Sequence, residues 1–270
     1  MQASRVIWPC LLIAIRWLAV PVTADEVSVL IRGNAEVTDD SAIAMFASSQ
    51  AKDERLALVD GLESLFDGVS FAGWKHLPGH VGHWTTQDNE IHYDGKAQEE
   101  KRFDKDLWTT KEFADFTLVV DWRLPAKPTL KPHPVVLPNG DFVFEQGQRK
   151  TFQHLDAGDS GIYLRGSSKC QINIWSQQLG SGEINGFRTD SQLPPAVRKA
   201  CLPIVNADYA FGKWNRFVIT MQGQRVTVAL NGATVIDNAQ LPGVPKRGPI
   251  GLQHHNDPVQ FRNLYIRELK

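Results

Sequence analysis

The sequence has no excess of charge of either sign. Among its 270 residues, 29 are Lys or Arg and 30 are Asp or Glu, which gives a formal net charge of −1. A chain so nearly balanced has no field that would attract nucleic acid or an anionic membrane surface. We therefore expect neither of these as a partner.

The sequence also lacks a long apolar run beyond its first 24 residues. At the N-terminus, Arg5 precedes an apolar stretch, residues 6–20, and the small-residue sequence Val22-Thr23-Ala24, a pattern typical of a cleaved signal peptide. Arg16 interrupts the stretch, which disfavours an uncleaved anchor because a spanning helix needs about 20 apolar residues. We predict a signal peptide over residues 1–24 and a secreted or periplasmic mature chain that begins near Asp25.

Cysteine is scarce as well. The mature chain would keep only Cys170 and Cys201, and an oxidising compartment would allow these two to form a disulfide. The alternation of apolar and polar residues around Cys170 points its side chain into the core. A buried free thiol is therefore at least as consistent with the sequence as a disulfide.

The sequence carries no clear metal-binding spacing. No Cys-x2-Cys pair is present, and the adjacent His254 and His255 cannot readily bind one ion because successive strand residues point to opposite faces. Asp257, Glu183 and Asp190 could still supply oxygen ligands for Ca²⁺ or a similar ion. No cofactor is identified, and a divalent metal stays an open alternative.

Two common hydrolase signatures are absent too. A retaining jelly-roll glycosidase would carry two carboxylates on one strand face about 5 Å apart, and no predicted strand shows such an alternation. The sequence also has no Gly-x-Ser-x-Gly elbow for a nucleophilic serine. Conventional glycoside hydrolysis and Ser-His-Asp catalysis are both disfavoured.

The rest of the chain is rich in short strands separated by turn residues. Residues 25–60 differ in composition from residues 61–270. We predict that they form a partly helical N-terminal extension, with Asp39-Asp40-Ser41 as a helix cap. Further on, Asn231-Gly232 lies between two alternating runs, which is a strong hairpin signal. This pattern predicts an all-β fold over residues 61–270, a concanavalin-like β-sandwich or jelly roll of unknown oligomeric state.

Two segments, residues 161–165 and 170–175, alternate apolar and polar residues as strands do when they bury one face. Their apolar members are Ile162, Leu164, Cys170, Ile172 and Ile174. Their polar members are Tyr163, Arg165, Gln171, Asn173 and Trp175. A surface of amides, a guanidinium and aromatic rings suits a carbohydrate, whose hydroxyls need planar partners and whose ring stacks on aromatics. An ordinary solvated sheet face is the alternative.

Two further segments supply candidates for proton transfer. In the strand 250–255, alternation places Gln253 and His255 on the polar face, and His255 is a candidate acid or base or else a simple hydrogen-bonding residue. The glycine-rich loop 180–190 carries Glu183 and Arg188. Glu183 is a candidate base, with a salt bridge to Arg188 as the alternative. The Pro-rich residues 124–158 form either a flap over the site or a surface hairpin.

A series of short motifs resembles the 3-keto-disaccharide hydrolase domain family (DUF1080) from Leu65 to Leu269. The motifs are Leu65-Phe66-Asp67-Gly68, Gly73-Trp74, Asp115-Phe116, Trp122-Arg123, the strand Asp159-Ser160-Gly161-Ile162-Tyr163-Leu164-Arg165, Gln171-Ile172, Trp214-Asn215, Asn231-Gly232, Gly248-Pro249-Ile250-Gly251-Leu252-Gln253 and Phe261-Arg262-Asn263. No single motif is diagnostic, but their order and spacing together are specific.

The resemblance implies an exported jelly roll that cleaves glycosides already oxidised at C3. The ketone acidifies the C2 hydrogen, so a base can remove it, the aglycone leaves C1, and water then adds. The family's histidine aligns with His255. Two positions depart from the commoner pattern: Asp159 stands where many members have Asn, and Cys170 where they often have Glu. Either Glu183 replaces that Glu, or this chain binds sugar without cleaving it.

The sequence thus leads to one preferred function and two alternatives. The preferred function is an acid–base enzyme in which Glu183 and His255 transfer protons. Substrate would be bound by Tyr163, Arg165, Gln171, Asn173, Trp175, Arg188 and Gln253. A lectin-like carbohydrate-binding module without catalysis is the main alternative. A protein-binding scaffold is the third.

Overall fold

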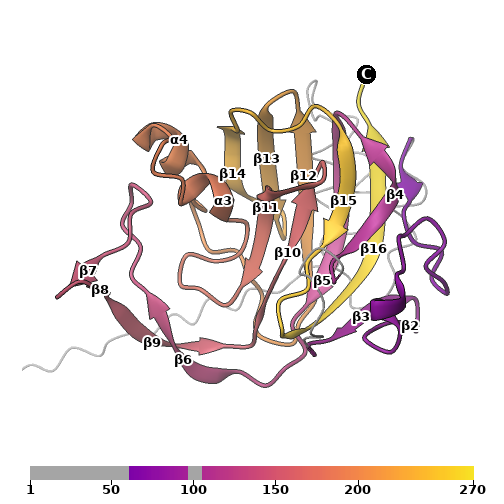
Figure 1. Cartoon of the computed structure of the whole chain (residues 1–270), viewed down its shortest axis with the longest axis horizontal. Helices are drawn as coiled ribbons and strands as arrows, with labels where there is room; N and C mark the ends of the chain where they lie inside the picture. The colour runs from indigo at the N-terminus through magenta and orange to yellow at the C-terminus, as the bar shows by residue number, and fades with distance from the viewer. Residues whose placement is uncertain (1–60, 97–104) are drawn as a thin grey trace, which may run out of the picture. The chain divides into compact units, whose positions relative to one another are not determined.

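The computed structural model describes residues 61–96 and 105–270. The predicted signal peptide, residues 1–24, and extension, residues 25–60, lie outside the described residues. Figure 1 shows antiparallel strands as the dominant element of the described part, with short helices at its periphery. The helices are η2 (Pro78–His80), α3 (Asn185–Arg188) and α4 (Pro195–Ala200).

The larger sheet has the strand order β14-β13-β12-β5-β16-β3-β2, and β1 pairs with β16. These strands are β1 (Glu63–Ser64), β2 (Trp84–Gln87), β3 (Glu90–Asp94), β5 (Phe116–Arg123), β12 (Asn215–Gln222), β13 (Arg225–Leu230), β14 (Ala233–Gln240) and β16 (Pro258–Glu268). The turn between β13 and β14 is the predicted Asn-Gly hairpin, because Asn231 and Gly232 both have positive φ, 52° and 85°.

The smaller sheet has the order β11-β10-β15-β4. Its strands are β4 (Leu107–Phe113), β10 (Asp159–Leu164), β11 (Ser167–Trp175) and β15 (Gly248–Leu252). Strands β10 and β11 pair in register, with Ile162 opposite Ile172 and Gly161 opposite Asn173. This sheet carries the two segments whose alternation suggested a site.

The two sheets enclose one hydrophobic core. From the smaller sheet, the apolar members of β10 and β11 are fully buried in it, and from the larger sheet so are Leu118, Val120, Phe217 and Ile219. The predicted inward face is therefore confirmed: Ile162, Leu164, Cys170, Ile172 and Ile174 all belong to this core. The predicted fold class, an all-β concanavalin-like sandwich, is also confirmed.

The segment between β5 and β10 is ordered. It forms the two-stranded ribbon of β6 (Thr129–Pro134) and β9 (Thr151–Asp156), extended by the small hairpin of β7 (Phe144–Glu145) and β8 (Gln148–Arg149). Residues 136 and 142 bridge around the turn at Asn139-Gly140. Figure 1 shows the ribbon reaching away from the β-sandwich.

Both described cysteines, Cys170 and Cys201, are buried free thiols. Burial raises the pKa of each thiol to about 12, since the thiolate would have to leave water. Of the two outcomes left open by the sequence, the structure shows the free thiol. Among the described residues, no helix is long and apolar enough to cross a membrane.

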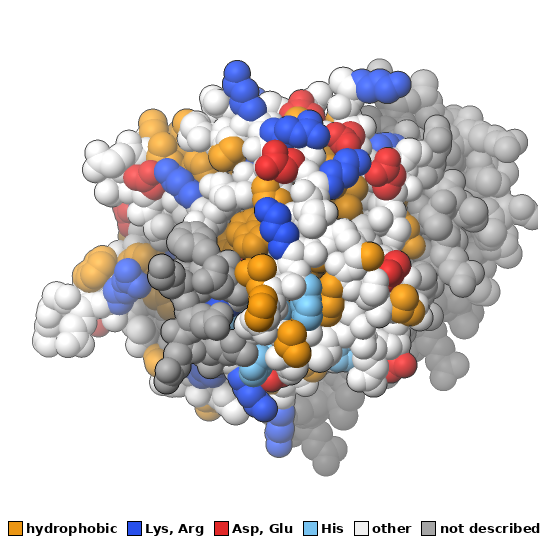
Figure 2. Space-filling view, turned by 45° about the vertical axis from the view of Figure 1, so that its right-hand side comes forward, with side chains coloured by type: hydrophobic (Ala, Val, Ile, Leu, Met, Phe, Trp, Pro, Cys, Tyr) orange, Lys and Arg blue, Asp and Glu red, His pale blue; other side chains and the backbone are white. Residues whose placement is uncertain are grey.

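Acidic and basic side chains lie interspersed on the face shown in Figure 2. This mixture agrees with the near-balanced composition. It gives that face no extended field of one sign.

We predict that Ile172→Ala will lower the free energy of unfolding by about 2–5 kcal/mol, because it opens a cavity between the two sheets. Ile204→Ala is the matched control, since Ile204 is 71% exposed and its truncation should cost less than about 0.5 kcal/mol. Urea unfolding of both variants measures the difference. Equal losses would show that Ile172 is not part of the sealed core.

Candidate active site

Three carboxamides meet on the polar face of the smaller sheet. The Gln171 Nε2 group donates hydrogen bonds to Asn173 Oδ1 (2.8 Å) and Gln253 Oε1 (2.6 Å), and lies 3.3 Å from the Ser160 carbonyl oxygen. The strands bring the three together, because Gln253 N donates to the Gly161 carbonyl (2.9 Å) next to β11. We call Gln171, Asn173 and Gln253 the carboxamide cluster. They share one face, as predicted, but all three are buried rather than open to solvent.

Gly161 makes room for the carboxamide cluster. A Cβ added at Gly161 would lie 2.7 Å from Gln171 Cγ, which is closer than side-chain carbon atoms approach. Any larger residue would therefore displace Gln171 from its position between its two partners. The glycine of the Asp-Ser-Gly motif is explained by this close approach.

Glu183 and Arg188 form a buried ion pair beside the carboxamide cluster. The loop after β11 returns along that strand, with Asn173 N donating to the Glu183 carbonyl (2.9 Å) and Gly182 N donating to the Asn173 carbonyl (2.8 Å). Arg188 Nε donates to Glu183 Oε1. Burial raises the pKa of Glu183, while the charge and hydrogen bond of Arg188 oppose the shift.

The ion pair leaves one buried carboxylate oxygen of Glu183 without a donor among the described residues. Among the described residues, Glu183 Oε2 has no hydrogen-bond partner although it is buried. The salt bridge to Arg188, weighed as an alternative to a functional Glu183, is therefore present, but it satisfies only one of the two oxygens. A buried acceptor without a donor is costly unless a ligand or water supplies one.

The ribbon between β5 and β10 also contacts the guanidinium of Arg188. Arg188 Nη1 donates to the Gly140 carbonyl (3.0 Å), and its guanidinium lies 4.6 Å from the centre of the Phe142 ring. Arg198 from α4 pairs with Asp141 (2.5 Å). The segment thus packs on the loop that carries Glu183.

Asp159 and His255 lie together at the end of β10. His255 Nδ1 is 3.8 Å from Asp159 Oδ2, and the imidazole is 45% exposed. Asp159 is directly opposite Trp175 in the strand pairing, so both side chains lie on the polar face. Among the described residues, Asp159 Oδ1 has no hydrogen-bond partner. We call Asp159 and His255 the acid–base pair.

The environment of Asp159 favours its protonated form. Burial raises the pKa of Asp159 well above its ordinary value, and the negative charges of Asp257, Asp156 and Glu183 raise it further. Lys131 is the opposing charge. A carboxyl that stays protonated can donate a proton or a hydrogen bond. Sequence reasoning noted Asp159 only as a departure from a family pattern, because the crowding of carboxyl groups arises from three separate chain segments.

Arg165 does not lie on the polar face as predicted. It follows β10 with a left-handed φ of 51°, which ends the strand alternation. Its guanidinium donates to the carbonyl oxygens of Ala114 (2.6 Å), Gly223 (2.7 Å) and Pro245 (3.0 Å) and to Asp115 Oδ1 (2.7 Å). These bonds tie loops together at the end of β10 remote from Asp159. Arg165 is therefore a structural residue, and we leave it out of the site.

Tyr163 keeps the predicted face but is sealed from solvent. Its ring is fully buried and stacks on Trp108, with centroids 5.3 Å apart and planes at 13°. Tyr163 lies opposite Gln171 in the strand pairing. It borders the carboxamide cluster as packing and offers a substrate no open surface.

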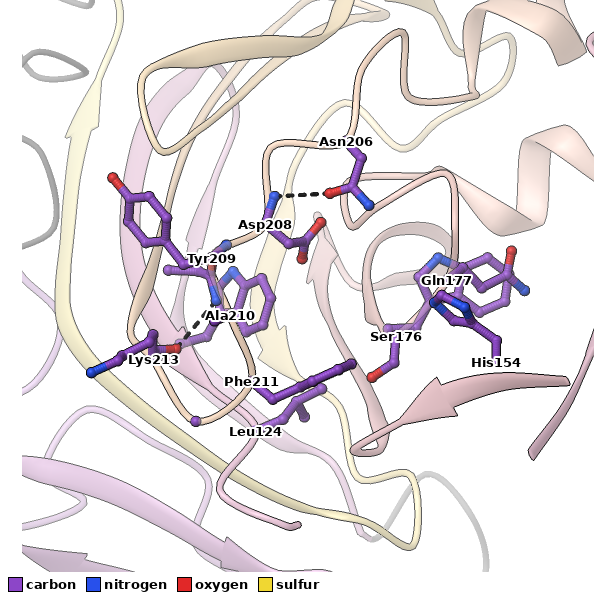
Figure 3. A pocket seen from close by; sticks show the side chains of 14 residues that line it. Leu124, His154, Ser176, Gln177, Asn206, Asp208, Tyr209, Ala210, Phe211 and Lys213 are labelled. Carbon is purple, nitrogen blue, oxygen red and sulfur yellow. Dashed lines mark hydrogen bonds between the residues drawn. The ribbon is translucent and has the colours of Figure 1, made fainter. Parts of the chain in front are cut away.

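Trp175 opens onto a pocket with a volume of about 200 Å³. Figure 3 shows Asp208, Ala210 and Lys213 on one side of this pocket and Ser176, Gln177 and His154 on the other. The pocket is also lined by Trp122, Leu124, Trp175 and Asn215. Sequence reasoning missed all of these except Trp175, because most lie in loops that have no strand or helix periodicity.

The oxygen-rich metal site suggested by the sequence is not assembled. Asp190 pairs with Lys169 (2.5 Å), Glu183 pairs with Arg188, and Asp257 accepts a hydrogen bond from Asp159 N (3.1 Å). Within residues 61–96 and 105–270, no three His, Cys, Asp or Glu side chains are grouped to hold a metal ion. Asp257, Glu183 and Asp190 are therefore dropped as a joint ligand set.

Residues 61–267 match the model of the 3-keto-alpha-glucoside-1,2-lyase-like domain. The chain belongs to this family. The match covers the described strands almost completely, and it confirms the resemblance inferred from the sequence motifs.

Two solved structures with the same fold come from Parabacteroides distasonis, and each is provisionally assigned as a glycosyl hydrolase. One is 23% identical with a TM-score of 0.50, covering 78% of this chain and 84% of its own. The other is 18% identical with a TM-score of 0.52, covering 83% of this chain and all of its own, 100%. These identities show a shared fold alone. No curated protein matches the chain.

We predict that Asp159→Asn will stabilise the protein at neutral pH. The folded-state pKa of Asp159 is raised, so its carboxyl favours folding most at pH values below its ordinary 3.8 and loses that contribution as pH rises through the raised value. The side chain introduced by Asp159→Asn does not ionise, so the variant does not lose stability in this way as pH rises. The two proteins should be equally stable near pH 3 and the variant more stable near pH 7.

Urea unfolding at a series of pH values measures this difference. Asp237→Asn is the control, because Asp237 is exposed and its substitution should leave the pH profile unchanged. A wild type that is the more stable protein near pH 7 would contradict the raised pKa of Asp159.

Proposed function

We propose that the chain is an exported, carbohydrate-active enzyme that cleaves 3-keto-glycosides by elimination followed by hydration. The observation that carries this proposal is the acid–base pair, Asp159 and His255, at the edge of the carboxamide cluster. The family supports it, since its described activity is that of a lyase on a 3-keto-glucoside. The predicted signal peptide is the basis for export.

The chemistry needs two proton transfers in the elimination step. A base takes the hydrogen from C2, the electron pair of that bond forms the C1–C2 double bond, and the C1–O bond breaks. The departing oxygen takes a proton from an acid. Water then adds across the double bond and yields the free sugar, which still carries the C3 ketone. No pair of opposed carboxylates is required, which fits their absence from the strands.

The site offers a group for each role. His255 is the base at C2, because its imidazole is exposed to a substrate and histidine exchanges protons near neutral pH. Asp159, whose pKa its surroundings raise, donates a proton to the leaving oxygen. Glu183 is the candidate base for the hydration step, because Arg188 satisfies only one of its oxygens. These assignments retain Glu183 and His255 as proton-transfer residues and add Asp159.

The carboxamide cluster would recognise the oxidised ring. Asn173 and Gln253 accept from Gln171 through their oxygens, which leaves their amide N–H groups as donors. Such donors stabilise the negative charge that develops on the C3 oxygen when the C2 proton leaves. Arg188 acts through Glu183, and Trp175 supplies an aromatic surface beside Asp159.

The decisive experiment incubates the purified protein with a panel of 3-keto-disaccharides, such as 3-keto-trehalose and 3-keto-lactose, with and without a chelator. Release of a monosaccharide supports the proposal. Binding of these glycans without release would favour the lectin-like module. If the protein neither binds nor cleaves these glycans, the protein-binding scaffold is the remaining alternative.

We predict that His255→Ala, Asp159→Asn and Glu183→Gln will each lower kcat by about 100-fold or more, since each removes a proton-transfer group. His92→Ala is the matched control and should keep full turnover, because His92 lies on the larger sheet beside Glu90. Circular dichroism of every variant confirms that it is folded. Full activity in all three site variants would remove this mechanism.

A further inference from the structure

The pocket beside Trp175 begins one strand spacing from the acid–base pair. Trp175 is the strand partner of Asp159, and opposed residues in neighbouring strands have Cβ atoms about 4.5–5.5 Å apart. The next residue, Ser176, accepts a hydrogen bond from Ala157 N (3.0 Å) through its Oγ atom. The pocket is thus continuous with the polar face at the level where bond cleavage is proposed.

Three residues that line the pocket each carry a buried N–H donor with no acceptor among the described residues. These donors are Trp122 Nε1, Trp175 Nε1 and Gln177 Nε2. Trp122 and Gln177 are only 3% and 6% exposed. Burial of an unpaired donor is destabilising, so a ligand whose acceptors reach these groups would be bound favourably.

The other lining residues restrict the class of ligand. Phe211, which is 43% exposed, and the indoles of Trp122 and Trp175 line the pocket and can pack on the apolar side of a ligand. Asp208 receives hydrogen bonds from Ser181 N (2.8 Å) and Ser181 Oγ (2.7 Å), and Lys213 lines the same pocket. The lining thus carries groups of both signs. Aromatic rings together with hydrogen-bonding groups suit a hydroxyl-rich ring.

The volume of the pocket sets the size of the ligand. Pockets for drug-sized molecules usually measure about 300–1,000 Å³, whereas this one measures about 200 Å³. One sugar ring fits such a space better than a whole disaccharide. The rest of a disaccharide would have to lie outside the pocket, on the neighbouring polar face.

We infer that the pocket binds the leaving sugar ring of the glycoside. This inference rests on the proposed function, because it places the oxidised ring on the carboxamide cluster and the scissile oxygen at Asp159. Trp175 then lies against the leaving sugar ring, and Phe211 and Gln177 contact the opposite side of that ring. The pocket makes the protein selective for disaccharides over glycosides with small leaving groups.

The first test measures sugar binding without turnover. D-Glucose is titrated into protein labelled with ¹⁵N at the tryptophan indoles, and the Trp122 and Trp175 Nε1 signals are followed. Both signals should shift on binding, because these donors gain acceptors. Unmoved indole signals would overturn the inference.

The second test separates binding from chemistry. Phe211→Ala removes an aromatic contact, and Gln177→Leu removes one donor with little change of volume. Each should weaken glucose binding by about 10-fold and raise KM for a 3-keto-disaccharide while kcat changes little, the pattern expected when uniform binding is lost. Phe144→Ala is the control, because Phe144 is 60% exposed on β7, outside the pocket.

The two proposals fail in different ways. If wild type releases no sugar from any 3-keto-disaccharide while glucose still moves the indole signals, the reaction is wrong and the pocket is a plain sugar-binding site. If cleavage proceeds and neither pocket variant changes KM, the leaving ring binds elsewhere and the inference is wrong.

Discussion

The structure depends on the alternation of side chains along β10 and β11. The same pleat that buries Ile162, Ile172 and Ile174 between the sheets turns Gln171, Asn173 and Asp159 to the opposite face. Loss of register by one residue would exchange the two sets, placing amides in the core and isoleucines in the site. Core stability and site geometry are therefore the same physical property of this strand pair.

Burial gives the polar face its chemical character. The negative charges of Asp156, Asp257 and Glu183 raise the pKa of Asp159, whereas Lys131 opposes that shift and Arg188 opposes the shift of Glu183. Carboxylates crowded with too few counter-ions share their protons unequally. Glu183 gains a dedicated partner in Arg188, while Asp159 does not gain one. The pKa of both carboxyl groups is raised, and for Glu183 the charge and hydrogen bond of Arg188 oppose the shift.

Strand periodicity predicted the parts of the site that lie within strands. The common face of Gln171, Asn173 and Gln253 follows from a two-residue repeat, and the motifs along the chain indicated the family. Arg165 was misplaced because a single left-handed residue ends the repeat, and sequence alone gives no sign of that conformation at an arginine. The pocket beside Trp175 was missed because residues 206–213 are a loop, whose position is set by tertiary contacts such as the bonds of Asp208 to Ser181.

The contact of Gly140 and Phe142 with Arg188 has a consequence for how the molecule can be re-engineered. Replacing the ribbon with a shorter loop would remove the Gly140 carbonyl and the Phe142 ring that contact Arg188. Arg188 would then no longer be held beside Glu183. The ribbon cannot be treated as an interchangeable appendage. The length of the ribbon and the ion pair between Arg188 and Glu183 therefore have to be changed together.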